Sequence, residues 1–200
     1  LADFAARHDL TLVSDDLHSD LLYDGTHVPL ASLDHEMRDR TVTLYGPTKA
    51  FNIPGLKISF AVSSNHDLLE RMNAAGGGLA TPPNVLAQAA TLGAYLEGDA
   101  WLEQVLAYLR TNRDHLLERV RSSMPRVQVH KPEATYLAWL DLRAFDLGDE
   151  PATTLAERAR VGLNDGATFG AGGKGFMRFN FATNRTILDE ALSRLEQVLV

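Results

Sequence analysis

The hydrophobic and polar positions along the chain change repeatedly between helical spacing and strand-like alternation. Residues 1–8 carry apolar positions at helical spacing, and the run 10–14 predicts a short buried strand. The run 41–45 predicts a second buried strand, with Val42 and Leu44 on one face. Polar and charged residues follow both strands. This is the layout of an α/β sheet that binds ligands at the carboxyl ends of its strands.

A further strand over residues 56–63 and three helices, over 65–74, 81–97 and 99–124, are expected next. Thr81 with two prolines after it predicts a helix start, and Gly98 ends that helix. Asp99 is expected to cap the long third helix. The apolar face of that helix consists of Leu102, Val105, Leu109, Leu116 and Val120. We place the domain boundary here, which divides the chain into residues 1–98 and 99–200.

The remainder of the chain predicts a small α+β domain, because strands and helices are mixed in it. Strands are expected over residues 127–130, 136–141 and 176–182, the last alternating with Met177, Phe179 and Phe181 on one face. Thr154 with Glu157 predicts a capped helix that extends to residue 161. A final helix is expected to be capped in the same way from Thr186.

Composition narrows the class of protein. The 200 residues are 45% hydrophobic and 22% charged, which is typical of a globular protein. A net charge of −7 argues against a nucleic-acid surface, which requires a basic footprint. The absence of cysteine excludes disulfides and fits a reducing, cytoplasmic location. We expect no membrane segment, and the first nine residues indicate a helix already under way, as in a piece of a larger protein.

Lys49 lies in a tight turn immediately after the strand 41–45. Gly46-Pro47 ends the strand, and Pro54-Gly55 breaks the chain again. A lysine held in this way can be partly desolvated and can serve as a nucleophile or a base. The alternative is a lysine on an exposed loop, which is the commoner case for an isolated residue.

Asp15 follows the other predicted strand, so the two groups face the same crevice if both strands belong to one sheet. An amine can form a Schiff base with an aldehyde cofactor. A carboxylate can keep the ring nitrogen of that cofactor protonated, which makes the ring an electron sink. The alternative for Asp15 is a residue of a turn or a helix cap.

Four further residues could contribute to binding. Arg178, on an alternating strand, can hold a substrate carboxylate with two hydrogen bonds, although an ordinary ion pair is equally expected. His18 could donate to a cofactor oxygen, but a lone histidine is more often structural. Lys57 and Thr48 could bind a phosphate, with surface solvation as the commoner alternative.

Other kinds of site are excluded by their spacing. The glycine-rich runs 76–78 and 170–173 fit neither nucleotide-binding loop pattern. The seven histidines show no metal-binding spacing, so we expect no metal site. Ser14 and Ser59 lack the surroundings of a nucleophile elbow.

Taken together, these segments resemble one family. Residues 14–20, SDDLHSD, are similar to the S-D-E-I-H-x-D segment of fold-type I pyridoxal-phosphate enzymes, in the cystathionine β-lyase branch of the class I/II aminotransferases. Residues 48–56, TKAFNIPGL, resemble the lysine motif of that family, and residues 133–141, EATYLAWLD, its E-A-T-Y strand. Phe169-Gly170 and the run from Arg178 to Asn180 resemble its closing elements.

The resemblance implies pyridoxal 5′-phosphate (PLP) as cofactor, with Lys49 as the Schiff-base lysine and Asp15 as the partner of the ring nitrogen. It implies that Arg178 binds the substrate carboxylate with support from Asn180, and that Lys57 binds phosphate. The implied fold is the C-terminal part of a large α/β domain with a mostly parallel sheet, followed by a small α+β domain. A homodimer is implied as well, with no nucleic-acid or membrane partner.

The implied reaction is the β-elimination of a cysteine thioether such as cystathionine, which gives a thiol, pyruvate and ammonia. Two alternatives stay open: an aminotransferase that uses the same residues, and a chain that is inactive without an N-terminal half or a partner. Two departures from the motifs stand out. Gly46 replaces the usual serine or threonine three residues before the lysine, and Asp16 replaces a glutamate. Family members are considerably longer, so the chain corresponds to their C-terminal half.

Overall fold

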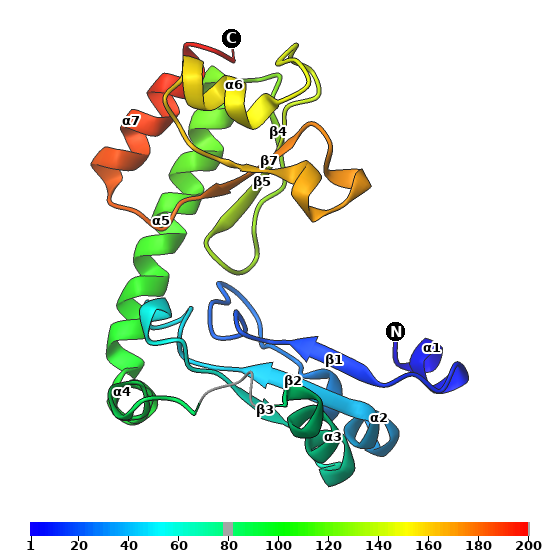
Figure 1. Cartoon of the computed structure of the whole chain (residues 1–200). Coiled ribbons are helices and arrows are strands. Elements are labelled where there is room, and N and C mark those ends of the chain that lie inside the picture. Colours follow the sequence, from blue (N-terminus) through cyan, green and yellow to red (C-terminus); the bar gives the residue numbers. More distant parts are fainter. Residues whose placement is uncertain (78–81, 200) are drawn as a thin grey trace. The chain divides into compact units, whose positions relative to one another are not determined.

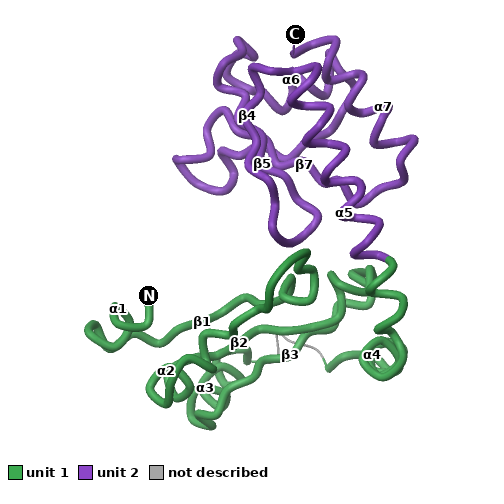
Figure 2. Tube along the Cα trace, turned by 180° about the vertical axis from the view of Figure 1, so that it is seen from behind, with its two compact units in different colours: residues 1–104 green, residues 105–200 purple. Residues whose placement is uncertain are grey.

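The computed structural model describes residues 1–77 and 82–199, which form two compact units (Figures 1 and 2). Unit 1 is Leu1–Gln104 and unit 2 is Val105–Val200. Both units combine helices with a β-sheet, so the predicted α/β class is confirmed. The division falls inside helix α5 (Asp99–Ser123), whereas the predicted domain boundary lies at the beginning of that helix. The assignment of residues 1–98 and 99–200 as domains stays a prediction.

Unit 1 is built on a three-stranded sheet in the order β1-β2-β3. The strands are β1 (Leu12–Asp15), β2 (Thr41–Tyr45) and β3 (Phe60–Val62). The pair β1 and β2 is parallel, and the pair β2 and β3 is antiparallel. The helices are α1 (Ala2–Arg7), α2 (His35–Arg40), α3 (His66–Gly76) and α4 (Val85–Glu97), with 3-10 turns at Leu30–Ser32 and Pro54–Leu56.

The helices of unit 1 begin where a polar side chain can cap them. Asn65 caps α3 by accepting from the Leu68 amide, and Gly98 ends α4 as the sequence predicts. Helix α4 begins later than predicted, because Asn84 caps it by accepting from the Ala87 amide at 2.9 Å. The predicted cap Thr81, like Gly78 of the glycine run, lies outside the described residues.

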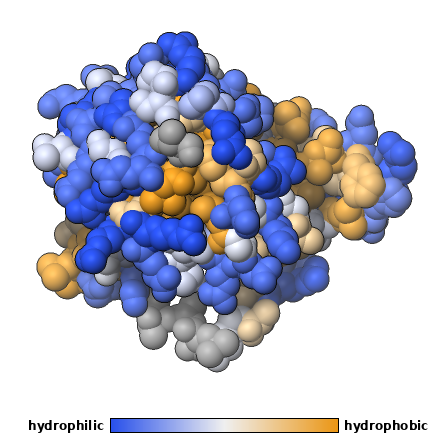
Figure 3. All heavy atoms as spheres, turned by 90° about the horizontal axis from the view of Figure 1, so that it is seen from above, coloured by the Kyte–Doolittle hydropathy of each residue, from blue (hydrophilic) through white to orange (hydrophobic). Residues whose placement is uncertain are grey.

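Burial differs along the sheet of unit 1. Val42 of the central strand is buried as predicted, but Thr41 on the other face is buried as well and Leu44 is only half-buried, so burial does not separate the two faces of β2. Val13 is 68% exposed, so the prediction of a buried first strand is wrong: β1 is an edge strand, paired on one side with β2. Val62 on the opposite edge is 53% exposed. Apolar residues therefore show among hydrophilic ones on the surface of the molecule (Figure 3).

Unit 2 is built on a four-stranded antiparallel sheet in the order β4-β5-β7-β6. The strands are β4 (Gln128–Val129), β5 (Leu137–Asp141), β6 (Asn164–Asp165) and β7 (Phe176–Asn180). The helices are the remainder of α5, α6 (Pro151–Arg158) and α7 (Arg185–Glu196), with 3-10 turns at Gly166–Phe169 and Ala171–Gly173.

The core of unit 2 lies on one side of β7. Met177 and Phe179 are buried, as their alternation predicts, and so is Phe181 just beyond the strand. Helix α5 is fastened here by Asn112, whose side-chain amide donates to the carbonyls of Phe181 at 3.0 Å and Thr183 at 2.8 Å. Apolar residues of three helices complete the core: Leu109, Leu116, Val120, Leu155, Leu188, Leu192 and Leu195.

Two predicted helix starts in unit 2 are wrong. Helix α6 begins at Pro151, three residues before the predicted cap Thr154, because a proline fits the first helical turn. The hydroxyl of Thr154 donates to the carbonyl of Leu147 instead. Helix α7 is capped by Asn184, which accepts from the Ile187 amide at 2.9 Å, and not by Thr186.

Candidate functional site

The two principal candidate residues of unit 1 lie at the ends of neighbouring strands of one sheet. Strand β1 runs parallel to β2, with Asp15 opposite Leu44 in the register. Lys49 lies five residues after Leu44, in the turn that follows β2. The carboxyl ends of parallel strands meet at the same sheet edge, so the structure brings both residues to one edge, as the sequence predicts.

Asp15 is exposed at the end of β1, and its Oδ1 atom accepts from the Leu17 amide at 3.3 Å. Asp15 therefore does act as a turn residue, which was the alternative role considered for it. One such contact leaves a carboxylate with further acceptor capacity, because its two oxygens offer about four lone-pair sites. Partnership with a ring nitrogen stays a prediction for Asp15.

Backbone hydrogen bonds fix the turn that carries Lys49. The Phe51 amide donates to the carbonyl of Pro47 at 3.0 Å, and the Ile53 amide donates to the carbonyl of Thr48 at 3.1 Å. Thr48 and Ala50 on either side are buried, while Lys49 itself is half-buried. The amine is thus carried by a rigid segment and not by an open loop.

Close packing around position 46 explains why this chain has a glycine where the family motif has a serine or threonine. A Cβ atom at this position would lie 3.1 Å from the carbonyl oxygen of Ile58 and 3.1 Å from the Cα of Ser59. These are backbone atoms, which yield less easily than the end of a side chain. The serine or threonine of the motif would be crowded here, so a phosphate would need other donors.

The residues predicted to bind the phosphate or another oxygen of the cofactor differ in their exposure to solvent. Thr48 is buried beside Lys49, and His18 is half-buried in the loop after β1. Lys57 is exposed and has a left-handed backbone with φ of 51°, at the end of the 3-10 turn Pro54–Leu56. The cofactor-binding roles of these three residues stay predictions.

The sequence analysis missed a buried carboxylate next to Asp15. Asp16 is only 7% exposed; it accepts from the Ser14 hydroxyl at 2.6 Å and lies 2.8 Å from Nε2 of His27. A carboxylate of this kind requires such partners, because burying an unpaired charge is costly. Ser14 is two residues away, but the sequence does not signal His27, which is eleven residues away in an irregular segment.

Tyr45 and Asp20 form a second pair that the sequence analysis missed. The Tyr45 hydroxyl donates to the Asp20 carboxylate. Burial, followed by this hydrogen bond, raises the pKa of Tyr45 to about 12. Burial also raises the pKa of Tyr95, which stacks on Tyr45 with ring centroids 6.2 Å apart.

Arg178 and Asn180 of unit 2 lie on the face of β7 opposite the core. Within the strand, their neighbours Met177 and Phe179 point the other way and are buried. Trp139 on β5 and Asn164 on β6 stand directly opposite Arg178 in the register. The structure therefore brings Arg178 and Asn180 to one surface of one strand.

Arg178 contacts an amide oxygen and an aromatic ring, and its role in binding a substrate carboxylate stays a prediction. One of its nitrogens, Nη2, donates to Oδ1 of Asn164 at 3.1 Å, and its guanidinium lies 4.8 Å from the centre of the Phe169 ring. Among the described residues, no aspartate or glutamate forms an ion pair with it, and its buried Nε atom has no hydrogen-bond partner. Asn180 accepts from the Ala182 amide at 2.9 Å.

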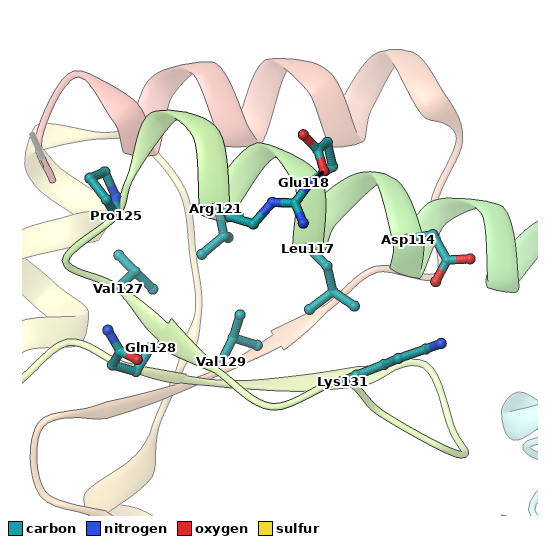
Figure 4. A pocket seen from close by; sticks show the side chains of 10 residues that line it. Asp114, Leu117, Glu118, Arg121, Pro125, Val127, Gln128, Val129 and Lys131 are labelled. Carbon is teal, nitrogen blue, oxygen red and sulfur yellow. Dashed lines mark hydrogen bonds and ion pairs between the residues drawn. The ribbon is translucent and has the colours of Figure 1, made fainter.

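A hollow of about 320 Å³ in unit 2 is lined by Arg178, Asn164 and Asn180 together with residues of α7. Another, of about 600 Å³, lies between α5 and β4 (Figure 4). Its charged residues are partly neutralised by their neighbours, since Arg121 pairs with Glu118. The predicted site residues lie outside this second hollow, and we assign it no ligand.

The described residues, 1–77 and 82–199, contain no cluster of three or more His, Asp or Glu side chains that could hold a metal ion. No helix among them has the length and apolar character that crossing a membrane requires.

The chain is similar to proteins of known name. It is 35% identical to the cystathionine β-lyase PatB of Bacillus subtilis, with 100% of the chain and 52% of PatB covered. It is 29% identical to an aspartate aminotransferase of Pyrococcus abyssi, with 100% and 51% covered. Cystalysin of Treponema denticola, whose crystal structure contains pyridoxal 5′-phosphate, superposes with a TM-score of 0.93 at 30% identity, over 98% of the chain and 51% of cystalysin.

The chain spans about half the length of the curated relatives it matches. The match to the family model runs over residues 1–195, nearly the whole chain. The family that the sequence motifs suggest is thereby confirmed: this chain belongs to the aminotransferase class I and II family.

Proposed function

We propose that the chain is part of a PLP-dependent carbon–sulfur lyase that acts on cystathionine or a related cysteine thioether. The observation that carries the proposal is the parallel pairing of β1 and β2, which brings Asp15 and Lys49 to one sheet edge. The similarity to cystathionine β-lyases of Bacillus subtilis and Corynebacterium glutamicum supports the lyase reaction over others.

The residues of this edge fit PLP. The cofactor needs an amine for its aldehyde, an acid for its ring nitrogen and donors for its phosphate. Lys49 and Asp15 supply the first two, and the buried Thr48 and the exposed Lys57 are candidates for the phosphate. When bound, PLP supplies an electron sink that makes the α-proton of an amino acid acidic.

Each residue then has one task. Asp15 keeps a proton on the ring nitrogen by placing a negative charge beside it. Arg178 grips the substrate carboxylate, and Asn164 and Phe169 keep its guanidinium in place. The Lys49 amine takes the α-proton as a general base. The Cβ–S bond then breaks, and the sulfur leaves with the electron pair as a thiolate. The remaining fragment keeps three carbons and the amino group, and water hydrolyses it to pyruvate and ammonia.

The proposal also covers the domains, the oligomeric state and the location of the complete protein. We propose that residues 1–98 belong to the large cofactor domain and residues 99–200 to the small domain of the complete protein. We also propose that this protein acts as a homodimer in the cytoplasm. The absence of cysteine supports a reducing location.

A cofactor titration tests the proposal. Adding PLP to the wild-type chain should produce the visible absorbance of a lysine-bound cofactor, and Lys49→Ala should abolish it. Lys57→Ala is the matched control and should weaken binding without removing the band. A Lys49→Ala variant that keeps the band would refute the assignment of Lys49.

An aminotransferase is the second candidate, supported by the similarity to the Pyrococcus abyssi enzyme. The two candidates differ in their products. A lyase releases pyruvate from cystathionine without any keto-acid acceptor, whereas an aminotransferase requires an acceptor. A wild-type chain that binds no PLP would favour the third possibility, a chain inactive without further polypeptide.

A further inference from the structure

We infer that Tyr45 is a positioning residue for the proposed cofactor site. Its hydrogen bond to Asp20 ties the segment that carries Asp15 to the strand that leads to Lys49. The inference rests on the proposed function for its ligand. Its physical basis is the set of contacts around the ends of β1 and β2.

The loop after β1 is fastened to β2 at two points. The Asp16 amide donates to the carbonyl of Leu44 at 2.9 Å, which extends the sheet by one hydrogen bond beyond Asp15. The chain then turns, and the carboxylate of Asp20 returns to accept from the Tyr45 hydroxyl. The segment that begins with Asp15 is thus closed against β2 at both ends.

Aromatic neighbours hold the Tyr45 side chain in place. Its ring lies 5.5 Å from that of Phe60 on β3 and 6.2 Å from that of Tyr95 on α4. Tyr45 is the donor and Asp20 the acceptor, because an ionised carboxylate has no proton to donate. A donor on a fixed ring sets the position of its partner more narrowly than one on a flexible chain would.

The short, buried segment between Tyr45 and Lys49 couples the position of Lys49 to that of Tyr45. Gly46, Pro47 and Thr48 are all buried, and Gly46 is packed closely against the backbone of Ile58. A shift of Tyr45 therefore moves Lys49, since no exposed, freely rotating residue lies between them. The hydrogen bond between Tyr45 and Asp20 consequently fixes the separation of the proposed acid and the proposed amine.

Amide hydrogen exchange tests, without any cofactor, whether the hydrogen bond between Tyr45 and Asp20 holds the two segments. Tyr45→Phe removes one hydroxyl and keeps the ring. We expect amides in residues 16–21 and 46–53 to exchange about tenfold faster than in the wild-type chain, the loss expected for one charge-assisted hydrogen bond. The matched control is Tyr108→Phe, which removes a hydroxyl that accepts from the Arg185 amide at 3.0 Å and should leave both segments unchanged. Unchanged exchange in Tyr45→Phe would overturn the inference.

PLP binding tests whether the hydrogen bond between Tyr45 and Asp20 positions Asp15 and Lys49. Tyr45→Phe should weaken PLP binding about five- to tenfold and shift the pH midpoint of the visible band, because the acid and the amine are no longer held together. Asp20→Asn keeps an acceptor oxygen and should retain most of the affinity, whereas Asp20→Ala should not. Faster exchange with unchanged affinity and midpoint would show a purely structural bond and overturn the positioning role. A wild-type chain that binds no PLP would refute the proposed function, and the exchange measurement would still decide this inference.

Discussion

The two units hold their candidate residues by different means. In unit 1, Asp15 is the last residue of its strand and Lys49 lies in the turn after its strand, and hydrogen bonds to the backbone hold both segments. In unit 2, Arg178 lies within a regular strand, and neighbouring side chains orient its guanidinium. The comparison teaches that substitutions should act differently in the two places: changes of backbone fit should matter in unit 1, and changes of side-chain chemistry in unit 2.

The largest effect should come from the guanidinium of Arg178. We expect Arg178→Lys to raise the KM for cystathionine about a hundredfold, because an ammonium cannot form the paired hydrogen bonds of a guanidinium with a carboxylate. Steady-state kinetics measures this effect. Arg160→Lys, in the lining of the same hollow, is the matched control and should change KM little. Equal KM values for wild type and Arg178→Lys would remove Arg178 from the site.

A substitution that crowds the backbone of unit 1 should have the next largest effect, and this effect should be on stability. Gly46→Ala places a Cβ atom 3.1 Å from the Ile58 carbonyl and should lower the free energy of unfolding by about 1–3 kcal/mol. Urea denaturation measures the change. Gly55→Ala, where a Cβ would meet nothing within 4 Å, should cost far less. If both variants were equally stable, close packing at Gly46 would not explain the missing serine.

The support of Arg178 should matter less than Arg178 itself. Asn164→Ala removes the acceptor that holds Nη2, and we expect KM to rise about tenfold with kcat nearly unchanged. Asn164→Asp should be worse than Asn164→Ala, because a new carboxylate beside the guanidinium would compete with the carboxylate of the substrate. The reverse order of the two variants would contradict a carboxylate-binding role for Arg178.

The smallest effect should be seen at alkaline pH in unit 1. The pKa of Tyr45 is raised in the folded chain from 10.0 to about 12, so its protonated form is favoured by folding. This contribution to stability is complete below pH 10 and is lost as the pH rises through about 12. Urea denaturation between these pH values should show a smaller loss of stability for Tyr45→Phe than for the wild-type chain. Identical slopes would show that the folded state does not raise this pKa.

The sequence predicted what depends on local pattern. The alternation of β7 correctly gave its buried face, and the motif around Lys49 correctly indicated a turn after a strand. Three helix starts were misplaced, since several polar residues near each start can act as caps and the choice among them depends on packing. The exposure of Val13 could not be predicted either, because the position of a strand in its sheet is a property of the whole fold.

The parts of the site that escaped prediction are pairs distant in the sequence. Asp20 and Tyr45 are separated by 25 positions, and Arg178 and Asn164 by 14. No periodicity connects such residues, because their contact depends on the register of strands that pair only after folding. The sequence is sufficient to propose single residues with a suitable chemistry, whereas the residues that contact them in the fold could not be proposed from it.

The close approach of Phe51 to Gly98 has a practical consequence for mutational scanning. A Cβ atom at Gly98 would lie 2.5 Å from the Phe51 ring and 2.3 Å from the carbonyl oxygen of Ala94, so any other amino acid would have to displace one of them. Phe51 is two residues from Lys49. A deep mutational scan selected on growth would therefore mark Gly98 as intolerant, and its intolerance would report two contacts: the end of helix α4 at Ala94 and the Phe51 ring almost fifty residues away in the sequence.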